Sequence, residues 1–434
     1  MKTVIMAGGR GTRISSVASD IPKPMIKIDG KPVLEHEIEC LRDQGFTDII
    51  LTVSHLGHII TDYFGDGTGI SPATGKPFGV TISYFFEKEP LGNAGALFRI
   101  KDQLTEDFLL LNADAMFDVD FNRFVAYHKQ HGGLVTLFTH PNSHPYDSGL
   151  IFANEYGAVE KWLAKEDERP EFYRNRVNAG LHVINPKVLD VEITTAKVDL
   201  DRQLLKPLAG TGKMFCYDSP EYVKDMGTPE RYYTVCEDVI SGRVKAKNLR
   251  NQQKAVFLDR DGTINKYVGF LRDIDQFELL EGVAEAIKKI NNSGYLAIVA
   301  TNQPVIARGE VTVPELREIH NKLETLLGKE GAYLDAIYYC PHHPHKGYEG
   351  EIPELKFDCE CRKPKAGMLL QAARDFNIDL SASYMVGDSD LDVQCGQNAG
   401  CTSVLISNGE SDGMHYNSVL DFVKDVIYKE NGHE

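Results

Sequence analysis

Short apolar runs alternate with helical patterns along most of the chain. Four apolar runs have the length of buried strands, at residues 4–6, 49–53, 108–111 and 134–138. Between them, residues 32–45 carry apolar side chains at helical spacing, with Pro32 in the first turn and Gly45 as a stop, which predicts a helix. This alternation predicts an α/β fold with a largely parallel sheet.

The alternation is interrupted once, at residues 243–253. This segment reads RVKAKNLRNQQ, which is polar and basic, without an acidic residue or an apolar run. A chain of 434 residues is expected to form two or three domains. We therefore predict a linker at 243–253 between two doubly wound, Rossmann-like domains. The first covers residues 1–242 and has a mixed sheet, and the second covers residues 254–434.

Helical patterns resume beyond the predicted linker and alternate with further apolar runs. We expect these helices at residues 282–293, 313–329, 365–376 and near 417–429.

The net charge and the lengths of the apolar runs limit the kinds of molecule that the protein is expected to bind. The formal net charge is −16 at pH 7, which argues against broad binding to nucleic acid or anionic membranes. A phosphate-bearing ligand must then be held by local cations. No segment approaches the roughly 18 uninterrupted apolar residues of a membrane span, and the N-terminus does not resemble a signal peptide. We expect a soluble, cytoplasmic protein that acts on small molecules.

Five of the eight cysteines are scattered singly and are expected to be reduced core residues. They are Cys40, Cys216, Cys236, Cys395 and Cys401.

A glycine-rich loop, AGGRGTR, follows the first apolar run at residues 7–13. Gly8, Gly9 and Gly11 allow backbone N–H groups to approach a phosphate without obstruction by side chains. The loop lacks the GK[ST] ending of a P-loop, and Ile14 stands where a dinucleotide-binding motif requires its third glycine. Neither common nucleotide motif therefore applies.

Five further segments accompany this loop in a fixed order. They are IPKPMIKIDGKP at 21–32, EKEPLGNAGAL at 87–97, LLLNADAMFD at 109–118, VNAGLHVIN at 177–185 and YVKDMGTPERY at 222–232. Together with the loop they resemble the sugar-phosphate nucleotidyltransferases, over roughly residues 1–240.

The resemblance implies specific roles in nucleotide transfer. Arg13 and Lys23 would grip the nucleotide phosphates, and Asp114 and Asp225 would hold Mg²⁺. The other nucleotide-binding residues would be Gly8, Gly9, Gly11, Thr12, Gly92 and Asn93. These residue types suit the chemistry, because the phosphate of a sugar 1-phosphate attacks another phosphate and cations must cancel the repulsion.

The resemblance assigns fewer residues to the binding of the sugar phosphate. Asn178 and Gly180 match the sugar contact of the family. Lys165 stands near the position of a lysine for the sugar phosphate, although the usual Glu-Lys pair reads Ala-Lys here and Lys161 is an alternative. Gly149 completes the expected sugar-binding set.

A second strand-and-carboxylate pattern, AVFLDRDGTIN, begins at residue 255. It does not fit the calcium-binding loop of an EF-hand. That loop requires glycine at its sixth position and glutamate at its twelfth, whereas here the glycine is fourth and the twelfth residue is Phe270. Three more motifs follow: AIVATN with Thr301, CRKPKAG with Lys363, and VGDSDLD with Asp388 and Asp392. Together the four motifs resemble the haloacid-dehalogenase-type phosphatases.

That resemblance implies a phosphoaspartate mechanism. Asp259 would attack phosphorus, and Asp261 would protonate the leaving group and then activate water. Thr301 and Lys363 would hold the phosphoryl oxygens. The Mg²⁺ ligands would be Asp259, Asp388 and the backbone carbonyl of Asp261, with support from Asp392, and the substrate would be read by Asn302 and Arg362.

Three cysteines and a histidine lie before the RKP sequence at 362–364. Cys340, His342, Cys359 and Cys361 form a set of four ligands that predicts a structural Zn²⁺ site with no position left for water. This zinc loop narrows the resemblance to the heptose-bisphosphate and histidinol-phosphate phosphatases, over roughly residues 254–410. Members of this subgroup typically lack a cap domain. One departure is Pro304-Val305, where the family usually carries Ser-Gly.

Together the two resemblances imply a bifunctional enzyme for nucleotide-activated heptose. It would remove the 7-phosphate of D-glycero-D-manno-heptose 1,7-bisphosphate and join heptose 1-phosphate to a nucleotide, with GTP as the expected donor and release of pyrophosphate. One alternative is a histidinol-phosphate-type phosphatase fused to a mannose-1-phosphate-type pyrophosphorylase. Another is a nucleotide-binding regulatory protein with an inactive transferase half. Whether copies of the chain associate is left open.

Overall fold

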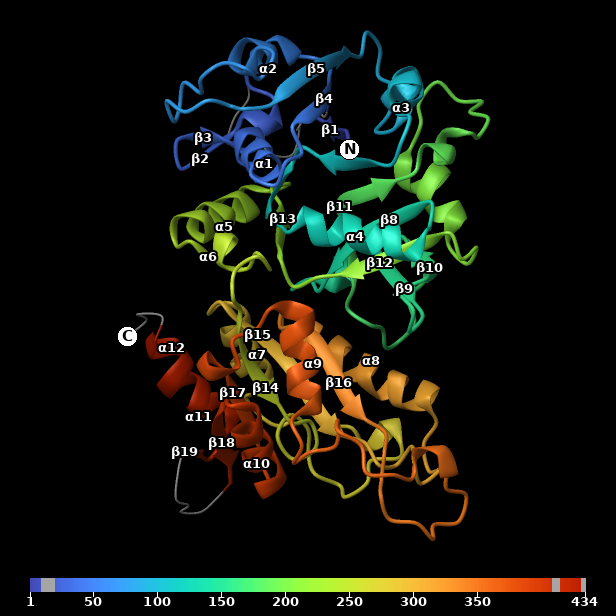
Figure 1. The fold of residues 1–434 in the computed structure, drawn as a ribbon, viewed down its shortest axis with the longest axis vertical. Helices are drawn as coiled ribbons and strands as arrows, with labels where there is room; N and C mark the ends of the chain where they lie inside the picture. Colours follow the sequence, from blue (N-terminus) through green and yellow to red (C-terminus); the bar gives the residue numbers. More distant parts are fainter. Residues whose placement is uncertain (9–19, 408–413, 431–434) are drawn as a thin grey trace. The chain divides into compact units, whose positions relative to one another are not determined.

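The chain folds into two compact units in a computed structural model that describes residues 1–8, 20–407 and 414–430 (Figure 1). Unit 1 comprises Met1–His140, Ile151–Trp162 and Asn178–Asn248. Unit 2 comprises Pro141–Leu150, Leu163–Val177 and Leu249–Glu434. Four predicted site residues, Gly9, Gly11, Thr12 and Arg13, lie outside the described residues.

Unit 1 is built on a nine-stranded mixed sheet. Strands β6, β1, β4 and β5 are neighbours in this order and parallel, with β5 at the edge, whereas β11 runs antiparallel to β6. The strands are β1 (Thr3–Met6), β4 (Asp48–Val53), β5 (Thr81–Phe86), β6 (Phe108–Asn112), β8 (Val135–His140), β9 (Leu150–Ala153), β10 (Val159–Leu163), β11 (Val177–Ile184) and β12 (Met214–Asp218). The mixed sheet predicted for the N-terminal half is confirmed.

Alternate side chains of these strands enter two different cores of unit 1. Ile5 packs in one buried cluster with residues of α1 and α4, and its neighbour Val4 packs in another with residues of α3. Burial on both faces makes each strand a nearly continuous apolar run, which is the pattern seen in the sequence. The helices are α1 (Val33–Arg42), α2 (Gly57–Phe64), α3 (Gly95–Arg99), α4 (Phe121–His131), α5 (Pro229–Ile240) and α6 (Arg243–Ala246).

A two-stranded ribbon in unit 1 brings two distant acidic segments together. Strand β7 (Ala115–Asp118) pairs antiparallel with β13 (Tyr222–Asp225), so that Asp225 lies opposite Ala115. A second short ribbon is formed by β2 (Lys27–Ile28) and β3 (Lys31–Pro32), after the short 3₁₀ helix η2 (Lys23–Met25).

Unit 2 contains a six-stranded sheet in the order β16-β15-β14-β17-β18-β19, in which every neighbouring pair is parallel. The strands are β14 (Lys254–Leu258), β15 (Tyr295–Asn302), β16 (Ala336–Cys340), β17 (Tyr384–Gly387), β18 (Thr402–Ile406) and β19 (Met414–Tyr416). The helices are α7 (Val283–Asn291), α8 (Val313–Lys329), α9 (Gly367–Phe376), α10 (Asp390–Ala399), α11 (Val419–Phe422) and α12 (Tyr428–Glu430).

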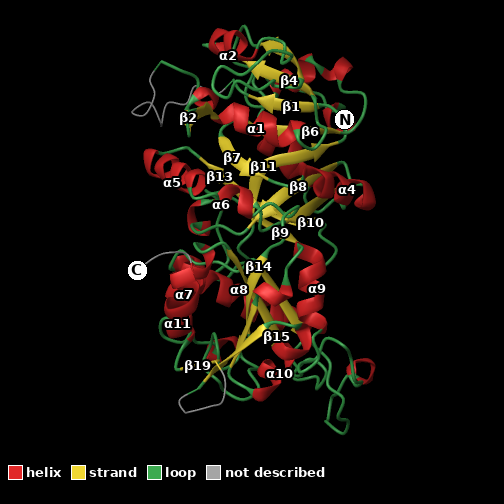
Figure 2. Ribbon diagram, turned by 60° about the vertical axis from the view of Figure 1, so that its left-hand side comes forward, coloured by secondary structure: helices red, strands yellow, loops and turns green. Residues whose placement is uncertain are grey.

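Helices cover both faces of the sheet in unit 2. Val256 of β14 packs in a buried cluster with side chains of α7, α8 and α11, whereas Phe257 packs with side chains of α9 and α10. Figure 2 shows α7 and α9 on opposite sides of these strands. The doubly wound α/β arrangement predicted for the second half is therefore confirmed.

Most predicted helices of unit 2 agree with the structure. Helix α8 has the predicted bounds of 313–329, with Thr312 as a cap whose side chain accepts a hydrogen bond from the Glu315 N–H. The predicted closing helix consists of α11, a π-helical turn at Val423–Ile427 and α12. Among the described residues no helix is long and apolar enough to cross a membrane.

The two units are not separated by one boundary in the sequence, because each consists of three segments of the chain. Residues 243–246 of the predicted linker form helix α6, and Val244 is buried in a core of unit 1. Two segments from the first half of the chain belong to unit 2. Within unit 2 the N–H groups of Tyr173 and Asn175 donate to Thr325 Oγ1 at 2.9 Å and to Glu324 Oε2 at 2.6 Å. Because these contacts join residues about 150 positions apart, no local pattern predicts them.

Candidate active sites

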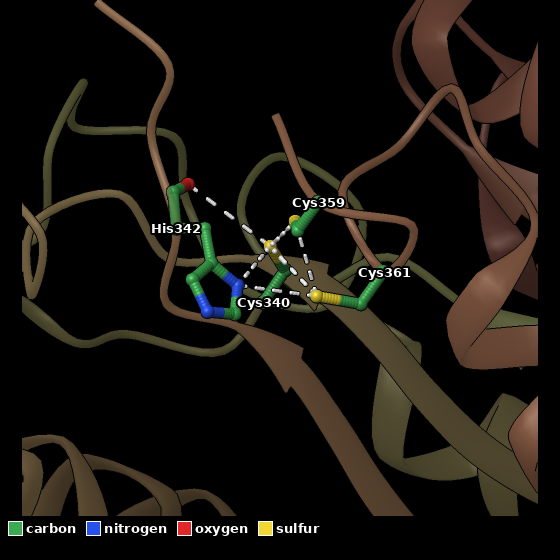
Figure 3. Close-up of side chains that lie close together, drawn as sticks. All are labelled: Cys340, His342, Cys359 and Cys361. Carbon is green, nitrogen blue, oxygen red and sulfur yellow. Dashed lines mark hydrogen bonds between the residues drawn. The ribbon is translucent and has the colours of Figure 1, made fainter. Parts of the chain in front are cut away.

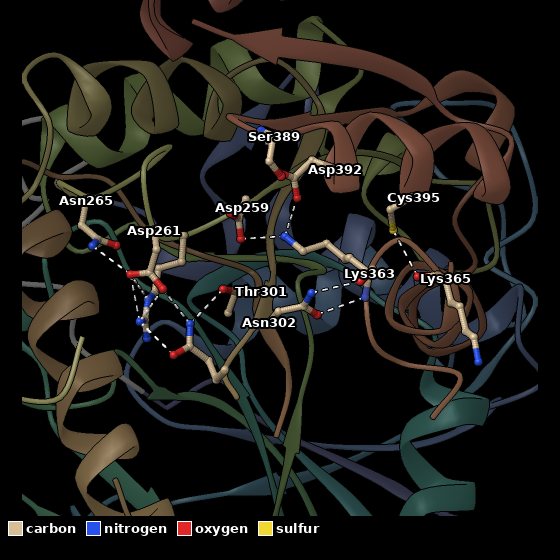
Figure 4. Close-up of polar contacts among 12 residues, drawn as sticks. Asp259, Asp261, Asn265, Thr301, Asn302, Lys363, Lys365, Ser389, Asp392 and Cys395 are labelled. Carbon is tan, nitrogen blue, oxygen red and sulfur yellow. Dashed lines mark hydrogen bonds and ion pairs between the residues drawn. The ribbon is translucent and has the colours of Figure 1, made fainter. Parts of the chain in front are cut away.

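Six of the predicted phosphatase residues lie at the ends of three adjacent parallel strands, and Figure 4 labels all of them except Asp388. The carboxyl ends of neighbouring parallel strands meet at one edge of the sheet. The residues that follow or end β14, β15 and β17 are Asp259, Asp261, Thr301, Asn302, Asp388 and Asp392. The fold therefore collects at one edge a set that spans more than 130 positions of sequence.

Lys363 binds two carboxylates at this edge. Its Nζ lies 2.7 Å from Asp259 Oδ1 and 2.5 Å from Asp392 Oδ1, and its side chain is only 3% exposed. Burial alone would lower the pKa of Lys363, but the negative charges of Asp259 and Asp392 outweigh it and raise the pKa. The lysine is therefore a fixed cation beside the predicted nucleophile.

The three acidic side chains Asp259, Asp388 and Asp392 form a group that could hold a metal ion, with one oxygen of each within 4.8 Å of the others. Burial, together with the nearby charges of Asp259 and Asp392, raises the pKa of Asp388 to about 6. Gly262 makes room for this carboxylate. A Cβ on Gly262 would lie 2.0 Å from Asp388 Oδ2, and its φ of +94° also favours glycine.

Asp392 has another role besides that of a metal ligand. Its Oδ2 accepts hydrogen bonds from the N–H of Ser389 at 3.2 Å and from Ser389 Oγ at 2.5 Å, as the capping box of α10. Its Oδ1 accepts from Lys363. Since both oxygens already have donors, Asp259 and Asp388 have the greater freedom to bind a cation.

Asn302 and Arg362 make contacts with the protein itself. Asn302 Nδ2 donates to the backbone carbonyl of Lys363 at 3.1 Å, and its Oδ1 accepts from the N–H of Lys363 at 3.0 Å. Arg362 donates to the carbonyl of His342 at 3.3 Å. Asn302 therefore positions Lys363. The sequence had predicted only that Asn302 contacts the substrate.

The predicted cysteine and histidine ligands are gathered in one cluster (Figure 3). The three Sγ atoms of Cys340, Cys359 and Cys361 lie 3.2 to 3.4 Å apart, too far for a disulfide, and all three cysteines are free. His342 Nδ1 lies 3.3 Å from Cys361 Sγ. Hydrogen bonds from Cys340 and Cys359 lower the pKa of the Cys361 thiol to about 5. Four soft donors in contact fit one tetrahedrally bound metal ion.

In unit 1 the two predicted acidic ligands each have a basic partner. Lys23 Nζ lies 2.8 Å from Asp114 Oδ2, and Arg231 contacts both oxygens of Asp225 at 3.0 and 2.7 Å. Burial alone would raise the pKa of Asp225, but the N–H of Gly227 and the charge of Arg231 lower it. The pairing of β7 with β13 brings these segments together, and the N–H of Met226 donates to the carbonyl of Asp114 at 3.2 Å.

Gly92 and Asn93 hold a neighbouring loop of unit 1. Gly92 has a φ of +82°, and a Cβ there would lie 2.3 Å from the carbonyl oxygen of Val198. Asn93 Oδ1 accepts a hydrogen bond from the N–H of Leu200 at 2.7 Å. These contacts give both residues a structural role in addition to the predicted contact with a nucleotide.

The predicted sugar-side residues are divided between the units. In unit 1, Asn178 Oδ1 accepts from the N–H of Gly180 at 3.2 Å and lies 3.1 Å from His182 Nε2. Gly149 and Lys165 belong to segments of unit 2, and Lys165 is exposed in a turn.

Two acidic residues of unit 1 were missed by the sequence prediction. Glu37 of α1 is fully buried, and burial together with the charge of Asp114 raises its pKa well above the usual range. Glu87 lies at the predicted nucleotide loop, where its Oε1 would be 3.2 Å from a Cβ on Gly8, and burial raises its pKa. An isolated carboxyl in a helix or after a strand carries no sequence signal that distinguishes it from a surface residue.

Comparisons with known proteins agree with the two sites. Residues 2–242 match a family model described as nucleotidyl transferase, and residues 360–426 match a HAD-hydrolase-like model. A D-glycero-beta-D-manno-heptose-1,7-bisphosphate 7-phosphatase from Haemophilus ducreyi is 45% identical over 161 residues, covering 37% of this chain and 86% of that protein.

Two further proteins match the first half of the chain. A probable mannose-1-phosphate guanylyltransferase 2 from Oryza sativa is 31% identical over 240 residues, covering 54% of this chain and 63% of that protein. The crystal structure of HddC from Yersinia pseudotuberculosis is 27% identical with a TM-score of 0.46, covering 55% of this chain and 99% of that chain.

The pKa of Asp388 leads to a prediction for metal binding in unit 2. Below about pH 6 Asp388 carries a proton, which a bound cation must displace, so affinity for Mn²⁺ should rise about tenfold per pH unit and level off at higher pH. Electron paramagnetic resonance of free Mn²⁺ during titration measures this affinity. Asp388→Asn should weaken binding and reduce its pH dependence; the part that remains comes from Asp259, whose pKa burial also raises. An unchanged affinity across this pH range would contradict the assignment.

Proposed function

Because this chain belongs to the nucleotidyl transferase family through residues 2–242 and to the D-glycero-beta-D-manno-heptose-1,7-bisphosphate 7-phosphatase family through its C-terminal part, we propose that it is a bifunctional enzyme of nucleotide-activated heptose biosynthesis. Residues 254–434 would remove the 7-phosphate of the heptose bisphosphate. Residues 1–242 would transfer a nucleotidyl group to heptose 1-phosphate, and of the predicted linker 243–253 only the part after α6 would join the two parts. Nucleoside triphosphates are cytoplasmic metabolites, which supports a cytoplasmic location.

The arrangement of Lys363 between Asp259 and Asp392 is the observation that best supports the phosphatase step. Asp259 attacks phosphorus and forms a phosphoaspartate while the P–O ester bond breaks. The leaving alkoxide takes a proton from Asp261. Water then attacks the phosphoaspartate and gives its proton back to Asp261, which releases phosphate and restores Asp259. Lys363 and Thr301 hold the phosphoryl oxygens during both steps.

Magnesium is the cation proposed for the acidic group of unit 2. Carboxylate oxygens are hard ligands that suit Mg²⁺, and Asp259, Asp388 and the carbonyl of Asp261 would hold it, with support from Asp392. When bound, the ion would screen the negative charges of the nucleophile and the phosphate from each other. Lys363 supplies a positive charge to the same oxygens from the protein side.

Zinc is the ion proposed for the cysteine and histidine cluster. Three thiols and one imidazole match a structural zinc site, which stabilises a loop and leaves no open position for chemistry. The loop that contains the cluster leads directly to Arg362 and Lys363. The ion would therefore hold in place the segment that presents the buried lysine. A phosphatase domain without a separate cap is part of the same proposal.

For the transferase step, cations must bring two phosphates together. Lys23 and Arg13 would bind the triphosphate, and Asp114 and Asp225 would hold Mg²⁺, which when bound neutralises phosphate charge. An oxygen of the sugar phosphate attacks the α-phosphate, and the bond to the departing pyrophosphate breaks. No nucleophile of the protein is required. Asn178, Gly180, Lys165 and Gly149 remain the proposed sugar-binding residues, and Gly92 and Asn93 the proposed nucleotide contacts.

GTP is the proposed nucleotide. The half-buried carboxylate of Glu87 beside Gly8 offers two acceptor oxygens, one of which also accepts from the N–H of Leu91 at 3.3 Å. Guanine presents adjacent N–H donors on its Watson–Crick edge, which a carboxylate can accept, whereas adenine and cytosine present an acceptor nitrogen there. This complementarity supports guanine.

Mutations in the two acidic sites should separate the two activities. Asp259→Asn should lower phosphate release by at least about 10³-fold and leave pyrophosphate release from GTP and heptose 1-phosphate within about twofold. Asp114→Asn should instead lower pyrophosphate release and leave phosphate release within about twofold. Separate assays of phosphate and pyrophosphate, with each of the four nucleoside triphosphates, measure both. Loss of both activities in either variant would contradict two independent sites.

Loss of a zinc ligand should lower stability without altering the transferase. Cys359→Ser should reduce the zinc content from about one ion per chain to nearly none and lower the unfolding temperature of the phosphatase part by about 5 °C or more. Inductively coupled plasma mass spectrometry and differential scanning calorimetry measure these changes. Cys236→Ser is the matched control and should change neither. Purified protein without zinc would contradict the assignment.

A further inference from the structure

Three side chains surround the carboxylate of Asp261. Arg260 Nη2 donates to Oδ1 at 3.0 Å and to Oδ2 at 2.8 Å. Asn265 Nδ2 donates to Oδ1 at 3.0 Å, and Gln303 Nε2 donates to Oδ2 at 2.8 Å. Arg260 Nε also donates to Oδ1 at 3.2 Å, so Oδ1 has three donor atoms and Oδ2 has two. Donors from three chain positions fix the plane of the carboxylate, which a single partner would leave free to rotate.

Arg260 is itself held rigidly. Its side chain is fully buried, which is unusual for arginine, and its Nη2 also donates to Gln303 Oε1 at 3.0 Å. On the other side, Nη1 lies 3.3 Å from His320 Nε2 of α8. Burial, together with the charge of Arg260, lowers the pKa of His320 well below its usual range, so the ring is neutral and can accept this hydrogen bond.

Gln303 connects the Asp261 carboxylate to the phosphate-binding side of the site. Its Nε2 donates both to Asp261 Oδ2 and to Thr301 Oγ1, the latter at 3.0 Å. An amide nitrogen carries two hydrogens, so both contacts can form together. Gln303 is 2% exposed, and its backbone N–H donates to the carbonyl of Cys340 at 2.8 Å, which anchors it at the end of β15.

We propose that Gln303 and Arg260 are positioning residues for proton transfer in the phosphatase site: they hold the Asp261 carboxylate in the orientation from which it protonates the leaving alkoxide. This inference rests on the proposed phosphatase function. The effect of both residues passes through the carboxyl oxygens of Asp261, to which they donate. Removing them should therefore slow formation of the phosphoaspartate, the step that kcat/KM reports, only where the leaving group requires a proton. The later attack of water also uses Asp261 but is the same for every ester.

Esters with different leaving groups test this positioning role. An alkyl phosphate releases an alkoxide that needs a proton, whereas p-nitrophenyl phosphate releases a stable phenolate that does not. Gln303→Met keeps the size of the side chain and removes its donors. It should lower kcat/KM by about tenfold or more for heptose bisphosphate and by less than about threefold for p-nitrophenyl phosphate. Arg260→Lys, which cannot bridge both oxygens, should show the same selectivity.

The ratio of the two kcat/KM values is measured on one sample, so the fraction of folded protein cancels. Gln371→Met, on the exposed face of α9, is the matched control and should leave both values unchanged. An equal loss on both esters, or no loss on either, would overturn the positioning role. Failure of the unaltered protein to hydrolyse either ester would instead overturn the proposed phosphatase function.

Discussion

The contact of Lys363 with Asp259 and Asp392 is the interaction on which the second site depends. A phosphate ester must reach a cluster of carboxylates, and repulsion would prevent this unless a cation stands at the point of attack. The lysine is buried between the two acids, so removing the lysine would leave buried negative charges without their cation, at a cost of about 3–5 kcal/mol. Asn302 on the backbone and Asp392 in the capping box of α10 maintain this arrangement.

The first site meets the same constraint with different elements. Lys23 faces Asp114 and Arg231 faces Asp225, on a protein whose net charge is strongly negative. Local pairing of acids with bases would allow the proposed magnesium triphosphate to bind where the average charge of the surface would repel it. In the proposed mechanism each unit presents carboxylates for a metal ion and a fixed cation for phosphate, although the two folds supply them from unrelated strands.

The sequence predicted the α/β class, the mixed and parallel sheets and the residues at the strand ends, because apolar runs and motif spacing are local. The spacing of three cysteines and His342 also predicted that these four side chains form one cluster, as they do in the structure. What it could not predict depends on contacts between distant residues. Asn302 turns toward the backbone of Lys363, Arg260 is buried against His320, and Glu324 binds the segment around Asn175. An arginine beside two aspartates gives no sign in the sequence that it is buried.

The most direct test of the bifunctional account is a phosphorus-31 NMR time course of one sample that contains the protein, heptose 1,7-bisphosphate, GTP and Mg²⁺. The account predicts that inorganic phosphate appears first, followed by pyrophosphate and the nucleotide sugar. At completion, one phosphate has been released for each pyrophosphate. Formation of the nucleotide sugar with the 7-phosphate still attached, or release of phosphate without any pyrophosphate, would contradict it.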